Sequence, residues 1–147
     1  MNVIVAQTAK EKEDAYSIRR IVFVQEQNVP LEEEIDQFDK DSVHFVLYDQ
    51  NKAIGAGRYR LVDSYGKVER ICILKNSRKG GAGKKLMNAI EVYALSHQAP
   101  SLKLNAQTHA IPFYEKLGYK AVSEEFLDAG IPHKTMIKIL QHKAKLQ

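Results

Sequence analysis

Glycines and cations gather at one point of this sequence. Residues 78–85 read Arg-Lys-Gly-Gly-Ala-Gly-Lys-Lys; a strand-like run, Val68–Leu74, comes before them and an amphipathic run begins at Leu86. Where a strand leads into a Gly-rich turn at a helix N-terminus, unpaired N–H groups and the helix dipole favour an anion. Glycine also lets a phosphate approach the backbone closely. The stretch 68–94 therefore predicts a phosphate-binding site.

Two common phosphate-binding motifs do not fit this turn. A P-loop requires Gly-x-x-x-x-Gly-Lys followed by Ser or Thr, but Arg78 occupies the first glycine position and Lys85 the hydroxyl position. A dinucleotide fingerprint requires Gly-x-Gly-x-x-Gly, and Leu86 stands where its third glycine belongs. The pattern that remains is Arg78-x-x-Gly81-x-Gly83.

Hydrophobic periodicity and turn residues indicate the elements that position this turn. Thr8-x-x-Glu11 is a capping box for a helix that ends near Gln27, and Pro112 and Gly118 bound a short helix. This order predicts an α/β (α+β) fold with a mixed, mostly antiparallel sheet of about seven strands and helices on both faces. The expected strands are residues 2–7, 43–49, 53–62, 67–74, 102–106, 119–122 and 133–140.

Length and composition limit the class of protein. With 147 residues, 44% hydrophobic and 27% charged, we expect one globular domain over residues 2–140 and a short basic tail over 141–147. No signal peptide and no long apolar run is present, which predicts a cytoplasmic protein without membrane contact. The net charge of +4 is concentrated around residues 78–85 and the tail, which argues against a nucleic-acid-binding stripe. A homodimer is compatible with the sequence.

A second block, Leu104–Tyr119, ends in Phe-Tyr-x-x-x-Gly-Tyr. Together with Arg78-x-x-Gly81-x-Gly83, it resembles the paired motifs of the GNAT superfamily of N-acetyltransferases. Val22–Pro30, Glu69–Cys72 and Asp128–His133 resemble segments of its ElaA/YjcF-like branch. The resemblance covers almost the whole predicted domain and implies a sheet that splays between its fourth and fifth strands.

The resemblance implies acetyl-CoA as the cosubstrate and no metal. The strand around Cys72 would offer its backbone to the pantetheine arm, and Asn105 would anchor that arm. Arg78 and the amides of the turn would hold the pyrophosphate, with Lys84 or Lys85 near the 3′-phosphate. The cofactor-binding residues implied are Ile71, Cys72, Ile73, Arg78, Lys79, Gly80, Gly81, Ala82, Gly83, Lys84, Asn105 and Tyr114.

Tyr114 is the general acid that the resemblance implies. A phenol, with an ordinary pKa of about 10, is neutral at pH 7 and can protonate the departing thiolate. The general base stays open between Glu69, His109 and Glu26. The expected substrate-binding residues are Glu26, Gln27 and Gln107.

The remaining chemical features are weaker signals. The acidic run Glu32–Asp41 could attract a cationic amine, but such a run is more often a solvated loop. Cys72, the single cysteine, lies in a strand and is expected to be an apolar core residue, which disfavours a covalent acyl-enzyme. We therefore expect an acetyl-CoA-dependent N-acetyltransferase that acts on a primary amine by direct attack in a ternary complex. The alternative is a CoA- or acyl-CoA-binding module without catalysis.

Overall fold

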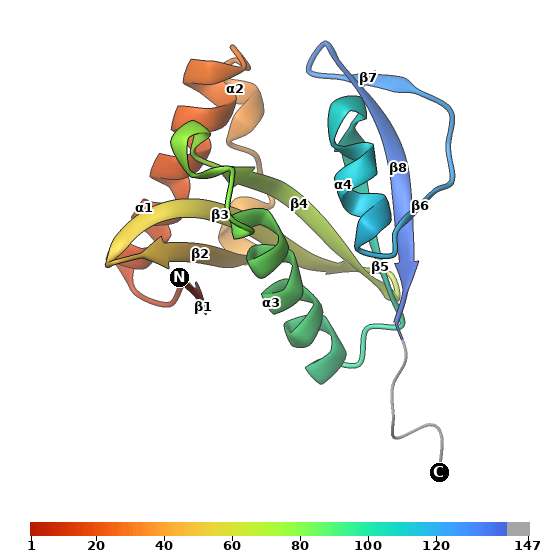
Figure 1. The fold of residues 1–147 in the computed structure, drawn as a ribbon, viewed down its shortest axis with the longest axis horizontal. Coiled ribbons are helices and arrows are strands. Elements are labelled where there is room, and N and C mark those ends of the chain that lie inside the picture. Colours follow the sequence, from red (N-terminus) through yellow and green to blue (C-terminus); the bar gives the residue numbers. More distant parts are fainter. Residues whose placement is uncertain (141–147) are drawn as a thin grey trace. The chain divides into compact units, whose positions relative to one another are not determined.

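The computed structural model describes residues 1–140 of the chain, and the predicted basic tail, 141–147, lies outside the described residues (Figure 1). The chain forms two compact units. Among the described residues, the first contains 1–60 and 70–90, and the second contains 61–69 and 91–140. Strands β3 (Lys52–Val62) and β4 (Tyr65–Ile73) and helix α3 (Ala82–Ser96) each contain residues of both units.

An antiparallel meander forms the sheet of the first unit. β1 (Asn2–Val5), β2 (Val43–Asp49), β3 (Lys52–Val62) and β4 (Tyr65–Ile73) are neighbours in this order. The turn between β2 and β3 has two consecutive residues with positive φ, Gln50 and Asn51, as a tight two-residue hairpin requires. The predicted meander is confirmed.

The first helix begins at the predicted capping box. In α1 (Ala9–Arg19), the Thr8 hydroxyl accepts from the Glu11 N–H at 3.1 Å, and the Glu11 carboxylate accepts from the Thr8 N–H at 3.1 Å. The chain then continues as a π-helix, η1 (Arg20–Glu26). The helix expected up to Gln27 therefore changes its hydrogen-bond pattern at Arg20. Such π-helical turns often occur at functional sites.

Three short turns and the start of a long helix complete this unit. The turns are α2 (Leu31–Glu34), η2 (Asp39–Asp41) and η3 (Lys75–Ser77), and the long helix is α3 (Ala82–Ser96).

The sheet of the first unit is covered on both faces, as predicted. On one face, Ala15 and Ile18 of α1 pack with Val46 of β2. The opposite face carries α3. There Gly57 allows a close approach, since an added Cβ would lie 3.1 Å from Cδ1 of Ile90.

The second unit is centred on β5 (Ser101–Gln107) and β8 (Ile131–Ile139), which pair antiparallel over the whole length of β5. β5 also pairs in parallel with the beginning of β4, but only from Gly66–Val68 to Leu102–Leu104. Both strands continue beyond the last of these pairs.

Short elements follow β5 along the chain. They are η4 (Thr108–Ala110), α4 (Ile111–Lys116), β6 (Lys120–Ala121) and β7 (Phe126–Asp128), and both strands pair with β8. β7 was not predicted, because three residues are too few to show an alternating pattern. Over residues 1–140, the sheet therefore has eight strands, in the order β1-β2-β3-β4-β5-β8-β6, with β7 beside β8.

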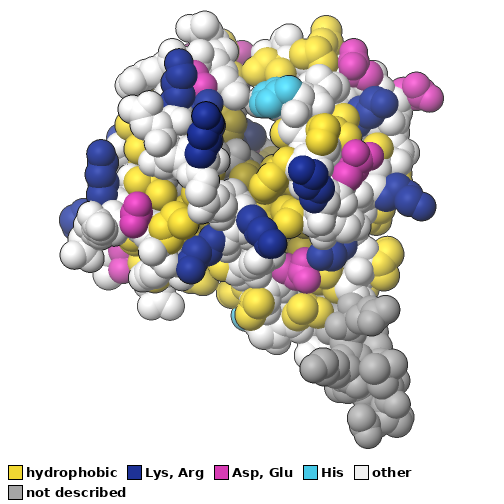
Figure 2. All heavy atoms as spheres, in the orientation of Figure 1, with side chains coloured by type: hydrophobic (Ala, Val, Ile, Leu, Met, Phe, Trp, Pro, Cys, Tyr) yellow, Lys and Arg dark blue, Asp and Glu magenta, His cyan; other side chains and the backbone are white. Residues whose placement is uncertain are grey.

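The surface is mixed in character. On the face of the molecule drawn in Figure 2, Lys and Arg side chains are scattered among hydrophobic and acidic ones, without a continuous basic stripe. No helix among the described residues has the length and apolar character needed to cross a membrane.

Candidate active site

The predicted phosphate turn has the backbone that its glycines imply. Gly80 and Gly81 have φ values of 99° and 84°, in the left-handed region that only glycine adopts without strain. The Lys85 N–H donates to the Gly81 carbonyl, so the N–H groups of Ala82, Gly83 and Lys84 precede the first intrahelical bond of α3. An added Cβ at Gly80 or Gly81 would meet nothing within 4 Å, so the turn is open to a ligand.

Arg78 is held by two groups of the first unit. Its Nε donates to the Ile73 carbonyl at 2.9 Å, and its Nη1 and Nη2 donate to the two carboxylate oxygens of Glu26 at 2.7 and 2.6 Å. The hydrogen bond from Arg78 lowers the pKa of Glu26 below its usual value. Arg78, which is predicted to bind the pyrophosphate, is thus paired with Glu26, which is predicted to bind the acceptor.

The strand expected to bind the pantetheine arm ends at Ile73, whose carbonyl accepts from this arginine. Ile71, Cys72 and Ile73 are the last residues of β4. Burial raises the pKa of the Cys72 thiol to about 12, and Cys72 belongs to the apolar core as expected.

One residue earlier, Arg70 has a φ of 58°. It is the only residue inside a described strand that has a positive φ without being glycine. Such a conformation costs about 1–3 kcal/mol and persists only where the surroundings hold it in place.

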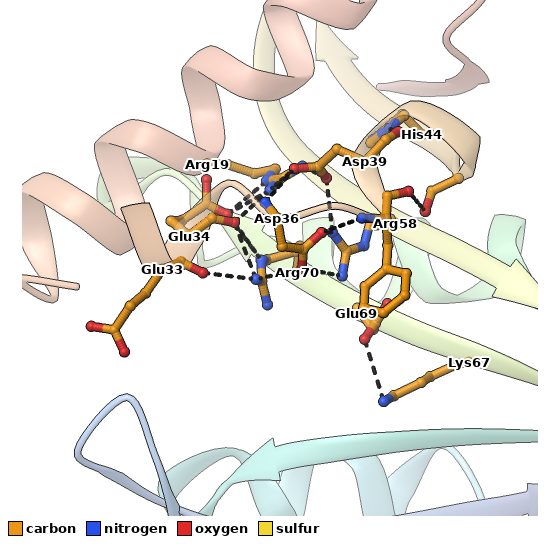
Figure 3. A network of polar contacts seen from close by, with 12 residues as sticks. Arg19, Glu33, Glu34, Asp36, Asp39, His44, Arg58, Lys67, Glu69 and Arg70 are labelled. Carbon is orange, nitrogen blue, oxygen red and sulfur yellow. Dashed lines mark hydrogen bonds and ion pairs between the residues drawn. The ribbon is translucent and has the colours of Figure 1, made fainter. Parts of the chain in front are cut away.

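An ionic cluster surrounds Arg70 in the first unit (Figure 3). Each charged side chain in the cluster is bonded to side chains of opposite charge. The Glu34 carboxylate accepts from Arg19 and Arg70, Asp36 accepts from Arg58 and Arg70, and Asp39 accepts from Arg19 and Arg58, at 2.6–3.2 Å. The six charges balance. We define the ionic cluster as Arg19, Glu34, Asp36, Asp39, Arg58 and Arg70.

The ionic cluster corrects the expectation of a solvated acidic loop. Glu34 and Asp39 are only 2% and 6% exposed, and Arg19 and Arg58 are 1% exposed. Burial alone would raise the pKa of Asp39, but the hydrogen bonds from Arg19 and Arg58 hold it well below its usual range. Half of the acidic run is thus structural, while Glu32, Glu33 and Asp41 stay exposed.

Tyr114 lies in the second unit, on α4, and is 8% exposed. Its ring makes edge contacts with Phe113 and Tyr119, with centroids 5.0 and 5.8 Å apart. Aromatic contacts of this kind hold the ring in a defined orientation. The role of proton donor stays a prediction.

The other candidates of the second unit are distributed along β4, β5 and η4. Asn105 is exposed, and its Oδ1 accepts from the Thr135 hydroxyl at 2.8 Å. Glu69 forms an ion pair with Lys67 at 3.5 Å on β4. His109 is exposed in η4, and Gln107 is half-buried at the end of β5.

Sequence reasoning missed the arginines of the ionic cluster. Only Arg58 could have been recognised from the sequence pattern. Alternation along β3 puts Arg58 on the same face as the core residue Ala56, and a strand arginine on a buried face needs an acidic partner. Arg19 and Arg70 carry no such local signal.

The comparisons with known proteins agree with these features. The family model "Acetyltransferase (GNAT) domain" matches residues 8–140. The Bacillus subtilis protein named "Uncharacterized N-acetyltransferase YjcF" is 52% identical over 139 residues, covering 94% of this chain and 99% of that protein. The chain therefore belongs to the GNAT acetyltransferase family, and its predicted likeness to the ElaA/YjcF-like branch is confirmed.

Solved structures share the fold. An acyl-CoA N-acyltransferase from Pseudomonas aeruginosa is 26% identical, with a TM-score of 0.83 over 94% of this chain and 99% of that chain. Escherichia coli ElaA is 23% identical, with a TM-score of 0.83 over 93% and 97%. An aminoglycoside 6′-N-acetyltransferase complexed with coenzyme A is 16% identical, with a TM-score of 0.73 over 95% and 97%.

Proposed function

We propose that this protein transfers the acetyl group of acetyl-CoA to a primary amine by direct attack in a ternary complex. One observation supports the donor above all others. The open turn of Gly80 and Gly81 presents the unpaired N–H groups of α3 to an anion directly after β4, in a chain of the GNAT family.

Donor binding is assigned to the first unit. The N–H groups from Lys79 to Lys84 and the guanidinium of Arg78 bind the pyrophosphate, because charge-assisted hydrogen bonds are the strongest that a protein can offer. The backbone of residues 71–73 pairs with the amides of the pantetheine arm as an added strand would. Lys84 or Lys85, both of which are exposed, binds the 3′-phosphate.

The chemical step then transfers one acyl group and releases one net proton. The ammonium form of the acceptor loses a proton to a base, and its nitrogen attacks the thioester carbonyl. The C–N bond forms, the nitrogen loses a second proton, and the C–S bond breaks. Tyr114 protonates the departing thiolate and is then reprotonated from solvent.

The three candidate bases differ in their surroundings. Glu69 is paired with Lys67, and Glu26 is paired with Arg78. His109 is exposed, and an imidazole is a common base near neutral pH. Gln27 and Gln107 are proposed to bind the acceptor with Glu26.

A covalent route through cysteine finds no support. The thiolate is the reactive form of cysteine, and Cys72 has a pKa raised to about 12 by burial. Since it is the only cysteine of the chain, direct transfer is the simpler mechanism.

Two measurements test the proposal separately. Isothermal titration with acetyl-CoA tests the donor, and we expect micromolar binding that free pyrophosphate weakens by competition. Release of CoA thiol with a panel of primary amines, with mass detection of the acetylated amine, tests the reaction. Binding without release for any amine would favour the non-catalytic module, and no binding at all would overturn the donor assignment.

A further inference from the structure

The backbone just before the proposed pantetheine-binding segment is strained at Arg70, and the side chain of this residue is bonded to the ionic cluster. Arg70 has its φ of 58° two residues after the last β4–β5 pair, at Val68, and directly before Ile71. Positive φ in a strand re-aims the residues that follow, as in a β-bulge. The direction of the Ile71–Ile73 backbone therefore depends on what holds Arg70.

The side chain of Arg70 supplies that hold. Its Nε donates to Oε2 of Glu34 at 2.9 Å, and its Nη2 donates to the Glu34 carbonyl at 3.1 Å and to Oδ2 of Asp36 at 3.2 Å. Figure 3 shows the guanidinium among these acceptors. The anchor is rigid, since Glu34 is 2% exposed and also bonds to buried Arg19.

The far end of the same segment is held by a second arginine. Arg78 donates to the Ile73 carbonyl at 2.9 Å. The segment Ile71–Ile73 is therefore held at one end by Arg70, which is bonded to the ionic cluster, and at the other end by the hydrogen bond from Arg78 to the Ile73 carbonyl. Pre-organised backbone binds a ligand more tightly, because less entropy is lost on binding.

We propose that Arg70 is a positioning residue for acyl-CoA: its side chain ties the left-handed residue of β4 to the ionic cluster and so directs the Ile71–Ile73 backbone toward the acyl-pantetheine arm. The proposal rests on the proposed function, in that acetyl-CoA is the ligand. It predicts that Arg70 affects binding of the arm and not binding of the phosphates.

The decisive variant is Arg70→Gly, because glycine accepts the positive φ, so that the side-chain anchor is removed without new backbone strain. Its binding is compared for two ligands, acetyl-CoA and adenosine 3′,5′-bisphosphate, which carries phosphates but no arm. We expect the Kd for acetyl-CoA to rise about tenfold or more, as loss of charge-assisted hydrogen bonds allows, while the Kd for the bisphosphate changes less than about twofold. Arg70→Lys, which keeps a cationic donor, should recover part of the affinity.

Gln98→Gly is the matched control. Gln98 also has a positive φ, 65°, and is exposed in the turn that follows α3. This variant should leave both Kd values unchanged. Hydrogen exchange gives a readout that needs no ligand: the amides of residues 71–73 should exchange faster in Arg70→Gly than in wild type or Gln98→Gly.

The outcomes separate the two hypotheses. If wild type does not bind acetyl-CoA, the proposed function fails, and the exchange rates still decide whether Arg70 orders the strand. If wild type binds and Arg70→Gly binds acetyl-CoA equally well, the positioning role is overturned. Equal weakening for both ligands would also overturn it, because that result indicates a general loss of structure.

Discussion

Glu26 and Arg78, 52 residues apart in the chain, form a bidentate ion pair with N···O distances of 2.6 and 2.7 Å. The guanidinium that we assign to the pyrophosphate is therefore also the partner of a carboxylate. A pyrophosphate that binds the same Nη1–Nη2 edge of Arg78 would displace Glu26. Displacement would free Glu26, at the end of η1, for the acceptor amine.

This competition predicts tighter cofactor binding when the charge of Glu26 is removed. In Glu26→Gln, we expect the Kd for acetyl-CoA to fall about two- to fivefold, the range expected for a partly exposed ion pair. Isothermal titration measures this directly. Glu13→Gln, which removes the similar pair with Arg20, is the control and should leave the Kd unchanged. An unchanged or higher Kd in Glu26→Gln would show that the pair does not oppose binding.

The phosphate turn predicts a difference between two glycine substitutions. Gly81→Ala and Gly130→Ala introduce the same strain, since φ is 84° and 76° and neither Cβ meets an atom within 4 Å. Each should cost about 1–2 kcal/mol of unfolding free energy. In Gly81→Ala alone, the new Cβ also holds the phosphate away from the N–H groups, so acetyl-CoA should bind about tenfold more weakly or worse. Equal Kd values for the two variants would remove Gly81 from the binding site.

The ionic cluster predicts a pH dependence of stability. The pKa of Asp39 is lower in the folded protein than in the unfolded chain, so its contribution is present above pH 4 and is lost progressively as the pH falls below about 4. Asp39→Asn should cost about 3–5 kcal/mol at pH 7, because it leaves buried arginines without their partner. Urea unfolding at pH 7 and pH 3 tests both statements.

Asp41, an exposed carboxylate two residues after Asp39, offers a control for the same experiment. Asp41→Asn should change the unfolding free energy by less than about 0.5 kcal/mol. The variant Asp39→Asn should also lose less stability between pH 7 and pH 3 than wild type loses. Parallel pH profiles for Asp39→Asn and wild type would contradict the assigned role of Asp39.

Direct transfer predicts that the thiol of the chain is dispensable. With a pKa of about 12, Cys72 should not react with iodoacetamide in the native state at pH 8. Cys72→Ala should retain turnover within about twofold, after a stability loss of about 1 kcal/mol for the lost packing. Mass spectrometry after mixing with acetyl-CoA gives the opposing test: an acetyl group on Cys72 would establish a covalent route.

Sequence patterns between neighbouring residues predicted the helices, strands and turns, but they did not predict the buried ionic cluster. The capping box of Thr8 and Glu11 and the glycines at 80 and 81 act through neighbouring backbone, so their outcome could be seen in the sequence. Arg19, Arg58 and Arg70 act on Glu34, Asp36 and Asp39 across 15 to 36 residues, and a run of acids with distant partners looks like a solvated loop.

Two backbone features were also beyond sequence reasoning. The π-helix from Arg20 to Glu26 is only seven residues long, and over that length its pattern of apolar residues does not distinguish it from an α-helix. The positive φ of Arg70 is imposed by tertiary contacts, since arginine has no preference for that region.

The proton donor can be isolated by a matched pair of tyrosine variants. Tyr114→Phe removes the proposed acid, whereas Tyr119→Phe removes the hydroxyl of the neighbouring ring, a buried Oη that forms no hydrogen bond among the described residues. Neither change alters the ring that packs against its neighbours, so both variants should fold.

The measurement that tests the account most directly is amine-dependent release of CoA from acetyl-CoA, under conditions where the chemical step limits the rate. We predict stoichiometric acetylated amine, a kcat that falls about 10²–10⁴-fold in Tyr114→Phe, and an unchanged Kd for acetyl-CoA. Tyr119→Phe should match wild type. A kcat in Tyr114→Phe equal to that of wild type would contradict the assignment of Tyr114 as the acid, and CoA release that ignores the amine would contradict acetyl transfer itself.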